Sequence, residues 1–172
     1  MGAEVEYVAL RELQMAGCVE CNACRRTGVC RVQDDFQGLF AQLLECDRLI
    51  YATPIFFMAV CSQAKVAIDR CQCLWSRKYV LKQPLLPDGP RDRRGMVIAV
   101  GGTKSQKMFE CVRLTFKYYF DVLEMAPGAE LFVNQVDAKG EVLQHPTAMA
   151  DALRLGRELV AGPDPSSQGA AT

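Results

Sequence analysis

The chain has 172 residues, half of them hydrophobic, and its 20 basic and 20 acidic side chains give a net charge of zero. That balance gives no electrostatic reason to expect a nucleic acid or an anionic membrane surface as a partner. Without a run of about 18 apolar residues or a basic-then-apolar leader after Met1, we expect a single-domain protein of the reducing cytoplasm.

The hydrophobic pattern predicts strands and helices in alternation. The strands are expected at residues 4–10, 48–52, 95–101 and 130–136. The helices are expected at residues 36–44, 62–75, 108–123 and 147–160. In the last of these, Met149, Leu153, Gly156 and Val160 share one side. Alternation of this kind predicts an α/β domain, a doubly wound parallel sheet with helices on both faces.

The domain is expected to occupy residues 1–161. The remaining residues, 162–172, are rich in glycine, proline, serine and alanine and are expected to form a disordered tail. Residues 82–94 make a turn-rich, charged connection, in which Arg91, Arg93 and Arg94 are expected to lie in a solvated loop.

Four cysteines, Cys18, Cys21, Cys24 and Cys30, follow the spacing C-x2-C-x2-C-x5-C after the first predicted strand. Two residues between thiolates allow neighbouring sulfur atoms to reach one metal site, and an overlapping C-x2-C-x2-C run is typical of iron–sulfur sites. The spacing favours a [4Fe–4S] cluster, while an empty reduced loop, a zinc site and disulfides remain alternatives.

The other five cysteines are expected to act as small buried hydrophobic residues. They are Cys46, Cys61, Cys71, Cys73 and Cys111. The spacing of Cys71 and Cys73 turns them to different sides of a helix, which makes them a poor ligand pair.

Two segments follow predicted strands and would meet at the carboxyl edge of a parallel sheet, where ligands of such folds bind. One is Thr53, Pro54, Ile55, Phe56 and Phe57, and the other begins with Gly101 and Gly102. Considered alone, the phenylalanines could equally be core residues, and the glycine pair is a weak signal.

Three stretches together resemble the NADPH-dependent FMN reductase family, and within it the iron–sulfur flavoprotein branch. They are CVECNACRRTGVCRVQDDF, ATPIFF and QAKVAIDR, at residues 18–36, 52–57 and 63–70. The resemblance implies a flavodoxin-like fold, FMN at the carboxyl edge of the sheet and a [4Fe–4S] cluster, with NAD(P)H as the electron donor.

The resemblance also implies roles for individual residues. It assigns Cys18, Cys21, Cys24 and Cys30 to the cluster. It places residues 53–57 and the pair Gly101 and Gly102 against the flavin ring. It gives Lys65, Asp69 and Arg70 a part in packing and pairing rather than in catalysis.

The chain departs from the family pattern at its start. The family opens with a strand and a glycine-containing loop that holds the FMN phosphate at a helix N-terminus, whereas residues 1–5 resemble the connection that leads into the second family strand. We therefore expect a flavodoxin-like sheet whose first strand, with its phosphate loop, is absent from this chain.

Three functions are open on this basis. The first is an NAD(P)H-dependent, FMN-containing oxidoreductase of the iron–sulfur flavoprotein type. The second is a one-electron carrier that exchanges electrons with a ferredoxin-type partner without nicotinamide chemistry. The third is a cofactor-free redox-sensing or interaction protein. The resemblance further implies a homo-oligomer, a dimer or a tetramer. Because His145 is the only histidine, Ser-His-Asp and Cys-His catalytic arrangements are not expected.

Overall fold

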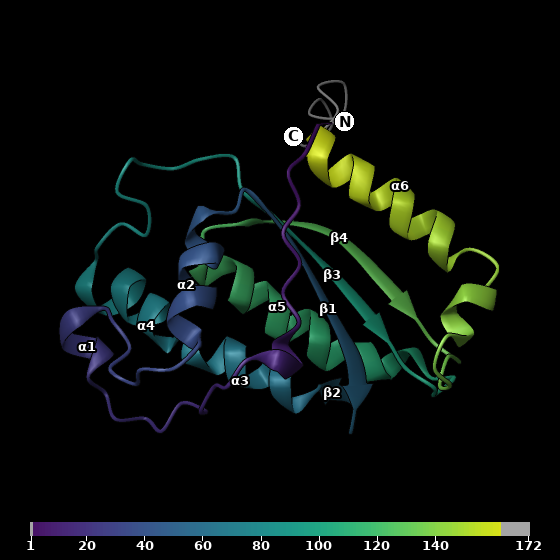
Figure 1. Ribbon diagram of the computed structural model, residues 1–172, viewed down its shortest axis with the longest axis horizontal. Coiled ribbons are helices and arrows are strands. Elements are labelled where there is room, and N and C mark those ends of the chain that lie inside the picture. The colour runs from purple at the N-terminus through teal and green to yellow at the C-terminus, as the bar shows by residue number, and fades with distance from the viewer. Residues whose placement is uncertain (1, 163–172) are drawn as a thin grey trace, which may run out of the picture.

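The computed structural model describes residues 2–162, which form one four-stranded sheet with helices around it (Figure 1). The strand order is β2-β1-β3-β4. The strands are β1 (Arg48–Phe56), β2 (Ala59–Val60), β3 (Arg94–Val100) and β4 (Ala126–Val133). The pairs β1–β3 and β3–β4 are parallel, and the short β2 is antiparallel to β1.

The principal helices are α2, α3, α5 and α6, with shorter helical turns between them. Their bounds are α1 (Cys24–Thr27), α2 (Phe36–Glu45), α3 (Ser62–Arg70), α4 (Gln72–Trp75), α5 (Glu110–Val122) and α6 (Ala148–Ala161). The turns are the 3-10 helices η1 (Leu10–Glu12), η3 (Gln106–Phe109) and η4 (Glu141–Gln144), and a π-helix, η2 (Ser76–Leu81). Among the described residues no helix is both long and apolar enough to cross a membrane.

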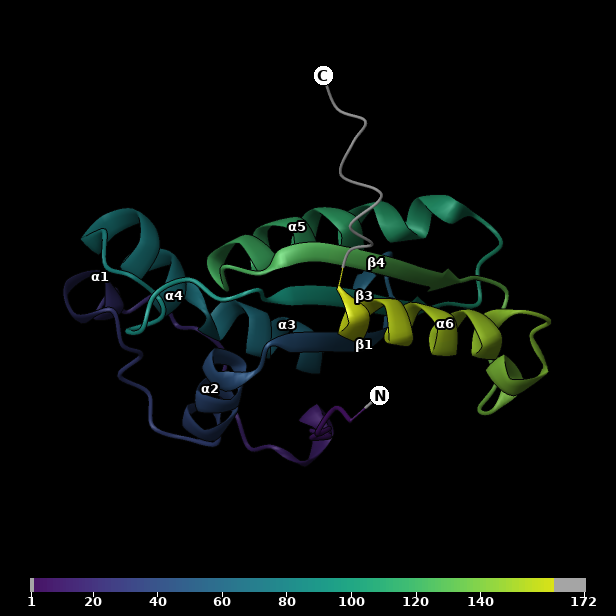
Figure 2. The ribbon, with the colours of Figure 1, turned by 90° about the horizontal axis from the view of Figure 1, so that it is seen from above.

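Helices cover both faces of the sheet, as expected. On β4, Phe132 stacks on Phe109 at 4.7 Å between ring centroids and belongs to the core shared with α5. Its neighbour Val133 points the other way and packs with Ala148 of α6. Figure 2 shows α5 and α6 on opposite sides of the strands. Successive side chains of β4 therefore pack into two separate apolar layers, one on each face of the sheet.

The side of α6 that carries Met149 and Leu153 faces solvent, with these two side chains 52% and 58% exposed. The buried positions of this helix are Ala148 and Leu159. The apolar stripe seen in the sequence is thus not the stripe that packs on the sheet.

The expectation of a strand at residues 4–10 is wrong. Residues 2–9 have no ladder bonds to β1 or to any other described strand, and η1 follows them. Figure 2 shows this segment on the side of β1 away from β3. One of its side chains, Glu6, accepts a hydrogen bond from Gln42 of α2 at 2.6 Å. A valine-rich sequence becomes a strand only where a neighbouring strand accepts its backbone groups.

Strand β1 has an open edge. Its partner β2 pairs only with Ile55 and Phe56, so from Arg48 to Pro54 the edge away from β3 has no strand partner within the described residues. The two faces of the sheet also differ in exposure at β1. Tyr51, on one face, is buried, whereas Ile50, on the other face, is 49% exposed. The sheet therefore ends at β1 with an apolar face that no described helix covers completely.

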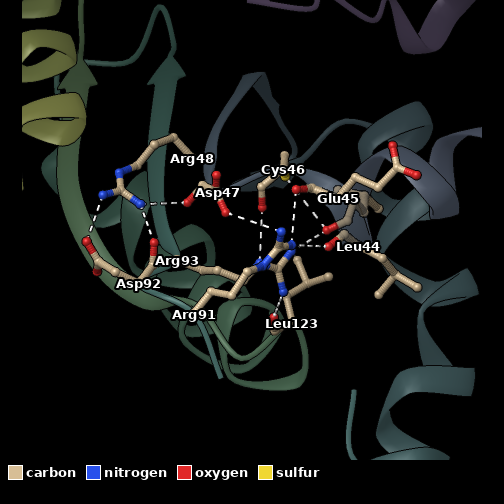
Figure 3. Close-up of polar contacts among 10 residues, drawn as sticks. Leu44, Glu45, Cys46, Asp47, Arg48, Arg91, Asp92, Arg93 and Leu123 are labelled. Carbon is tan, nitrogen blue, oxygen red and sulfur yellow. Dashed lines mark hydrogen bonds and ion pairs between the residues drawn. The ribbon is translucent and has the colours of Figure 1, made fainter. Parts of the chain in front are cut away.

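Arg93 is not solvated, contrary to the expectation for residues 82–94. It is 2% exposed and donates hydrogen bonds to the backbone carbonyls of Leu43, Cys46 and Leu123 (Figure 3). These carbonyls lie at the C-terminal ends of α2 and α5, where the helix dipoles are negative. Burial lowers the pKa of Arg93. The guanidinium thus joins two helix ends just before β3 begins.

The tail expected at residues 162–172 falls, apart from Gly162, outside the described residues.

Candidate cofactor site

The cysteine loop, residues 18–30, lies between η1 and α2 and includes α1. All four of its cysteines line one cavity of about 430 Å³. Cys18 and Cys21 are exposed, while Cys24 and Cys30 are partly buried. The opposite wall comes from the end of α3, from α4 and from the start of η2. The structure thus brings together every residue that the spacing predicts as a metal ligand.

Unusual backbone angles give the loop its curvature. Glu20 and Asn22, on either side of Cys21, adopt left-handed conformations with φ of 52° and 57°, and the Asn22 amide donates to the Glu20 carbonyl at 2.9 Å. Gly28 ends α1 with φ of 70°. A β-carbon on Gly28 would lie 2.7 Å from Cγ of Arg77, so a glycine is needed there for space as well as for backbone angle.

A buried arginine ties together the two ends of the loop. Arg70, at the end of α3, donates from Nη1 to the Ala16 carbonyl at 2.9 Å and to Asp34 Oδ2 at 2.6 Å. Its Nη2 donates to the Val32 carbonyl at 3.0 Å. Asp34 Oδ2 also accepts from the Ala16 backbone N–H at 2.9 Å. One ion pair therefore holds the segment before the first cysteine next to the segment after the last.

The charges in this ion pair stabilise each other. Burial opposes ionisation of Asp34, but hydrogen bonds from Arg70 and from two backbone N–H groups outweigh it and lower the pKa of Asp34. Burial likewise acts against the Arg70 cation, while the hydrogen bond to Asp34 and the nearby Cys30 thiol raise the pKa of Arg70 above its ordinary value.

A fifth sulfur atom, that of Cys73, lies on the cavity wall. Its thiol donates to the Arg70 carbonyl at 3.4 Å, and burial raises the pKa of Cys73 to about 12. Cys71, two residues earlier, points instead into the core, where its thiol donates to the Ala67 carbonyl. The different sides predicted for the two cysteines are confirmed, but the place of Cys73 beside the loop was not predicted.

Ser76 also contacts the loop, with its hydroxyl 3.4 Å from the Cys24 sulfur. No local pattern singles out Ser76, because it lies 52 residues away from Cys24. Of the remaining cysteines predicted to be buried, Cys61 is buried and Cys46 partly so, but Cys111 is exposed on α5. The expectation for Cys111 is therefore wrong.

The donor set fits a soft metal centre, because thiols dominate the lining. No group of three potential ligands in the described residues lies close enough together to hold a single metal ion. Four thiolates around one zinc ion, at about 2.3 Å each, would lie only about 3.8 Å apart.

The second predicted group lies at the carboxyl ends of β1 and β3. The register pairs Pro54 with Val100, so residues 53–57 and Gly101 meet at the same edge. Gly101 and Ile55 are packed closely: a β-carbon on the glycine would lie 3.2 Å from that of Ile55. A β-carbon on Gly102 would lie 2.9 Å from Oδ1 of Asp137. Gly101 is therefore closely packed, whereas the contact at Gly102 is with the exposed side chain of Asp137.

The members of this group do not all face the same way. Pro54, Phe56 and Phe57 are exposed, and Phe57 sits with Met58 in a left-handed turn between β1 and β2. Thr53 instead is buried, and its hydroxyl accepts from the Cys61 backbone N–H at 3.3 Å. Exposed apolar rings beside two glycines fit a flat aromatic ligand, whereas Thr53 shapes the start of α3 from within.

The two groups are not close to each other within one chain. In both views α1 lies at one end of the molecule and the carboxyl ends of β1, β3 and β4 lie toward the other (Figures 1 and 2). The described residues thus form two separate candidate sites, one of thiols and one of apolar rings and glycines.

The chain is similar to known proteins named iron-sulfur flavoproteins. The chain is 29% identical over 130 residues to an iron-sulfur flavoprotein of Archaeoglobus fulgidus, a match covering 74% of this chain and 63% of that protein. It is 30% identical over 127 residues to an iron-sulfur flavoprotein of Methanocaldococcus jannaschii, covering 73% and 60%. The matched part therefore spans less than two thirds of each of these relatives.

Solved structures give the same fold. A Bacillus subtilis structure described as a Trp repressor binding protein has a TM-score of 0.55 at 29% identity, covering 72% of this chain and 71% of that chain. A flavone reductase superposes with a TM-score of 0.64 over 93% of this chain and 52% of its own, at 18% identity.

The family profile described as NADPH-dependent FMN reductase matches residues 1–136, which include the cysteine loop, β1, α3, β3 and β4. That range covers most of the chain and contains both candidate sites. The chain belongs to the NADPH-dependent FMN reductase family.

Proposed function

We propose that this chain is the electron-transferring part of an NAD(P)H-dependent, FMN-containing oxidoreductase of the iron–sulfur flavoprotein type. The observation that carries the proposal is the convergence of Cys18, Cys21, Cys24 and Cys30 on one cavity. The relatives named iron-sulfur flavoproteins, at 29% and 30% identity, support it. Bound FMN would supply hydride chemistry and a [4Fe–4S] cluster would supply one-electron transfer.

In this proposal the residues of the chain bind and orient. The four cysteines hold the cluster, and Ser76 donates a hydrogen bond to the Cys24 sulfur. At the carboxyl edge, Pro54, Phe56 and Phe57 offer apolar contacts to a flavin ring, and Gly101 and Gly102 let it approach the backbone. No side-chain acid or base is required, because the cofactors carry the difficult chemistry.

The separation of the two candidate sites favours a homo-oligomer, a dimer or a tetramer. Within one chain the cysteine loop and the carboxyl edge lie toward different ends (Figure 2). Assembly of several copies would allow the loop of one copy to approach the edge of another. The exposed rings of Phe56 and Phe57 would then be covered.

A one-electron carrier with a ferredoxin-type partner is the second candidate. Exposure of Cys18 and Cys21 favours it, because a cluster bound there would lie near the surface and within reach of a second protein. Both candidates require the reducing conditions of the cytoplasm, which keep the thiols free.

The test is the visible absorption spectrum of the chain purified without oxygen and reconstituted with iron, sulfide and FMN. Flavin bands over a broad shoulder that dithionite bleaches are expected. Bleaching by NADPH or NADH supports the oxidoreductase, whereas bleaching only by a reduced ferredoxin supports the carrier. A protein that stays colourless after reconstitution contradicts both and leaves the cofactor-free function.

A further inference from the structure

Arg70 donates hydrogen bonds to the chain on both sides of the cysteine loop. Its side chain is completely buried, and its two terminal nitrogen atoms reach acceptors on both sides of the loop. Ala16 lies two residues before Cys18, and Val32 lies two residues after Cys30. The distance between the two ends of the loop is therefore fixed by one rigid guanidinium group.

The orientation of the guanidinium is also fixed. Its plane lies over the Phe36 ring, 4.5 Å from the centroid, in a cation–π contact. Phe36 is itself 1% exposed and begins α2. The arginine is thus held between three polar acceptors and one aromatic face.

One donor of the guanidinium has no acceptor. Nε of Arg70 is buried and makes no hydrogen bond within the described part of the chain. Buried N–H groups are nearly always paired, so an unpaired one calls for an explanation. Arg70 and Cys30 line the same cavity, and the Cys30 thiol is close enough to the guanidinium to raise the pKa of Arg70.

We propose that Arg70 is a positioning residue for the four-cysteine site, which presets the loop before metal is bound and offers its Nε–H to the sulfur of Cys30. This inference rests on the proposed function only for its second half. Fixing the loop ends depends on hydrogen bonds within the protein alone. An N–H donor and a positive charge beside a ligand sulfur stabilise the more negative, reduced form of a cluster.

A lysine at position 70 could not replace the arginine. Three acceptors on different sides of the group, Ala16, Val32 and Asp34, match a planar fork of N–H donors. An ammonium group carries its donors on one atom and cannot reach all three at once. Arg70→Lys keeps the positive charge but cannot donate to all three acceptors at once. The matched control is Arg26→Lys, at an exposed position of α1.

The first experiment uses metal-free protein and measures hydrogen–deuterium exchange of peptides covering residues 14–34. In Arg70→Lys, exchange in this segment should be about tenfold faster than in the wild type, because the segment opens locally. Exchange in β3 and α5 should stay the same, and Arg26→Lys should match the wild type throughout. Unchanged exchange at residues 14–34 in Arg70→Lys would overturn the presetting role.

The second experiment uses the reconstituted protein and follows the midpoint potential by an EPR-monitored titration. Arg70→Lys should hold less iron per chain and show a more negative potential than Arg26→Lys. Asp34→Asn keeps the guanidinium and loses one loop anchor, so it should loosen residues 14–34 with little change in potential. If Arg70→Lys does not fold, Asp34→Asn still tests the presetting role through exchange.

The two experiments can fail separately. A wild-type chain that takes up no iron contradicts the proposed function, while the exchange experiment still decides the presetting role. A cluster that forms with the same iron content and the same potential in Arg70→Lys and in wild type would refute the contact with Cys30.

Discussion

The ring of Phe120 lies directly over Gly95, so closely that a β-carbon on the glycine would be 2.2 Å from Cε1 of the phenylalanine. Gly95 is on β3, in the middle of the sheet, and Phe120 belongs to the last turn of α5. This contact sets how closely α5 approaches the sheet.

Gly95→Ala should therefore destabilise the protein, by about 1–3 kcal/mol, because the core must shift to admit a methyl group. Urea unfolding followed by circular dichroism measures the change. Gly38→Ala is the control: it lies in α2 with nothing within 4 Å of the added carbon, and it should stabilise by about 0.5–1 kcal/mol through helix propensity. Equal effects of the two changes would show that the contact with Phe120 is unimportant.

Cys21→Ser should abolish iron binding by the reconstituted chain while leaving bound flavin intact, because Phe56, Phe57 and Gly101 lie away from the cysteine loop. Iron and FMN per chain, measured on the same sample, provide the test. Cys111→Ser, at an exposed cysteine of α5 outside the cavity, should retain both. Full iron content in Cys21→Ser would refute the ligand assignment.

Arg93→Met should destabilise the fold by at least about 3 kcal/mol. The change removes one buried cation and leaves the carbonyls of Leu43, Cys46 and Leu123 without their donor, at a cost of about 1–3 kcal/mol for each buried group that water cannot reach. Arg154→Met is the matched control. Arg154 pairs on the surface with Asp151 and Glu158, so its loss should cost less than about 1 kcal/mol. Chemical denaturation of Arg93→Met and Arg154→Met measures the free energy of unfolding that each variant loses relative to the wild type.

The ion pair of Asp34 with Arg70 should make the folded protein less stable as the pH falls. The folded pKa of Asp34 is lowered below its ordinary value of 3.8. The stability that Asp34 contributes is therefore fully present above its unfolded-state pKa of 3.8. It is lost as the pH falls through the lower pKa of Asp34 in the folded protein.

Asp34→Asn should accordingly be less stable than wild type at pH 7, by about 1–3 kcal/mol, and the gap should shrink by pH 3. Urea titrations of metal-free protein at both pH values measure the gap. Asp88→Asn, at an exposed aspartate that makes no hydrogen bond in the described part of the chain, should change stability by less than about 0.5 kcal/mol at either pH. A gap for Asp34→Asn that is as large at pH 3 as at pH 7 would contradict the ion pair.

The cysteines of the folded, metal-free chain should differ sharply in their reactivity toward iodoacetamide at pH 8. Cys18, Cys21 and Cys111 are exposed and should react first. Burial raises the pKa of Cys73 to about 12 and also raises that of Cys71, so their thiols stay protonated and unreactive. Mass spectrometry of the labelled peptides measures the order. Early labelling of Cys71 would mean that the core around α3 opens readily.

The sequence was most informative where periodicity was strong. The apolar run at residues 95–101 became β3, and the helical spacing from Met108 to Leu123 became η3 and α5. The four cysteines that the spacing predicts as ligands line one cavity. These features depend on neighbours within a few residues, which a single sequence shows directly.

The features that the sequence missed depend on distant partners. Strand β4 begins at Ala126, before Pro127 and Gly128, two residue types that rarely predict a strand. The pairing shifts register there, because Gly95 pairs with Pro127 but Val97 pairs with Glu130. Arg93 resembles any charged loop residue until the carbonyls at the ends of α2 and α5 are placed beside it. Strand pairing and burial of charge are decided by tertiary contacts rather than by local pattern.

The open edge of β1 has a practical consequence for anyone who handles the isolated chain. From Arg48 to Pro54 that edge presents backbone donors and acceptors beside the exposed side chain of Ile50. Such an edge is a template for pairing with the same edge of another molecule. Ile50→Lys should therefore raise the concentration at which a solution of the chain turns cloudy.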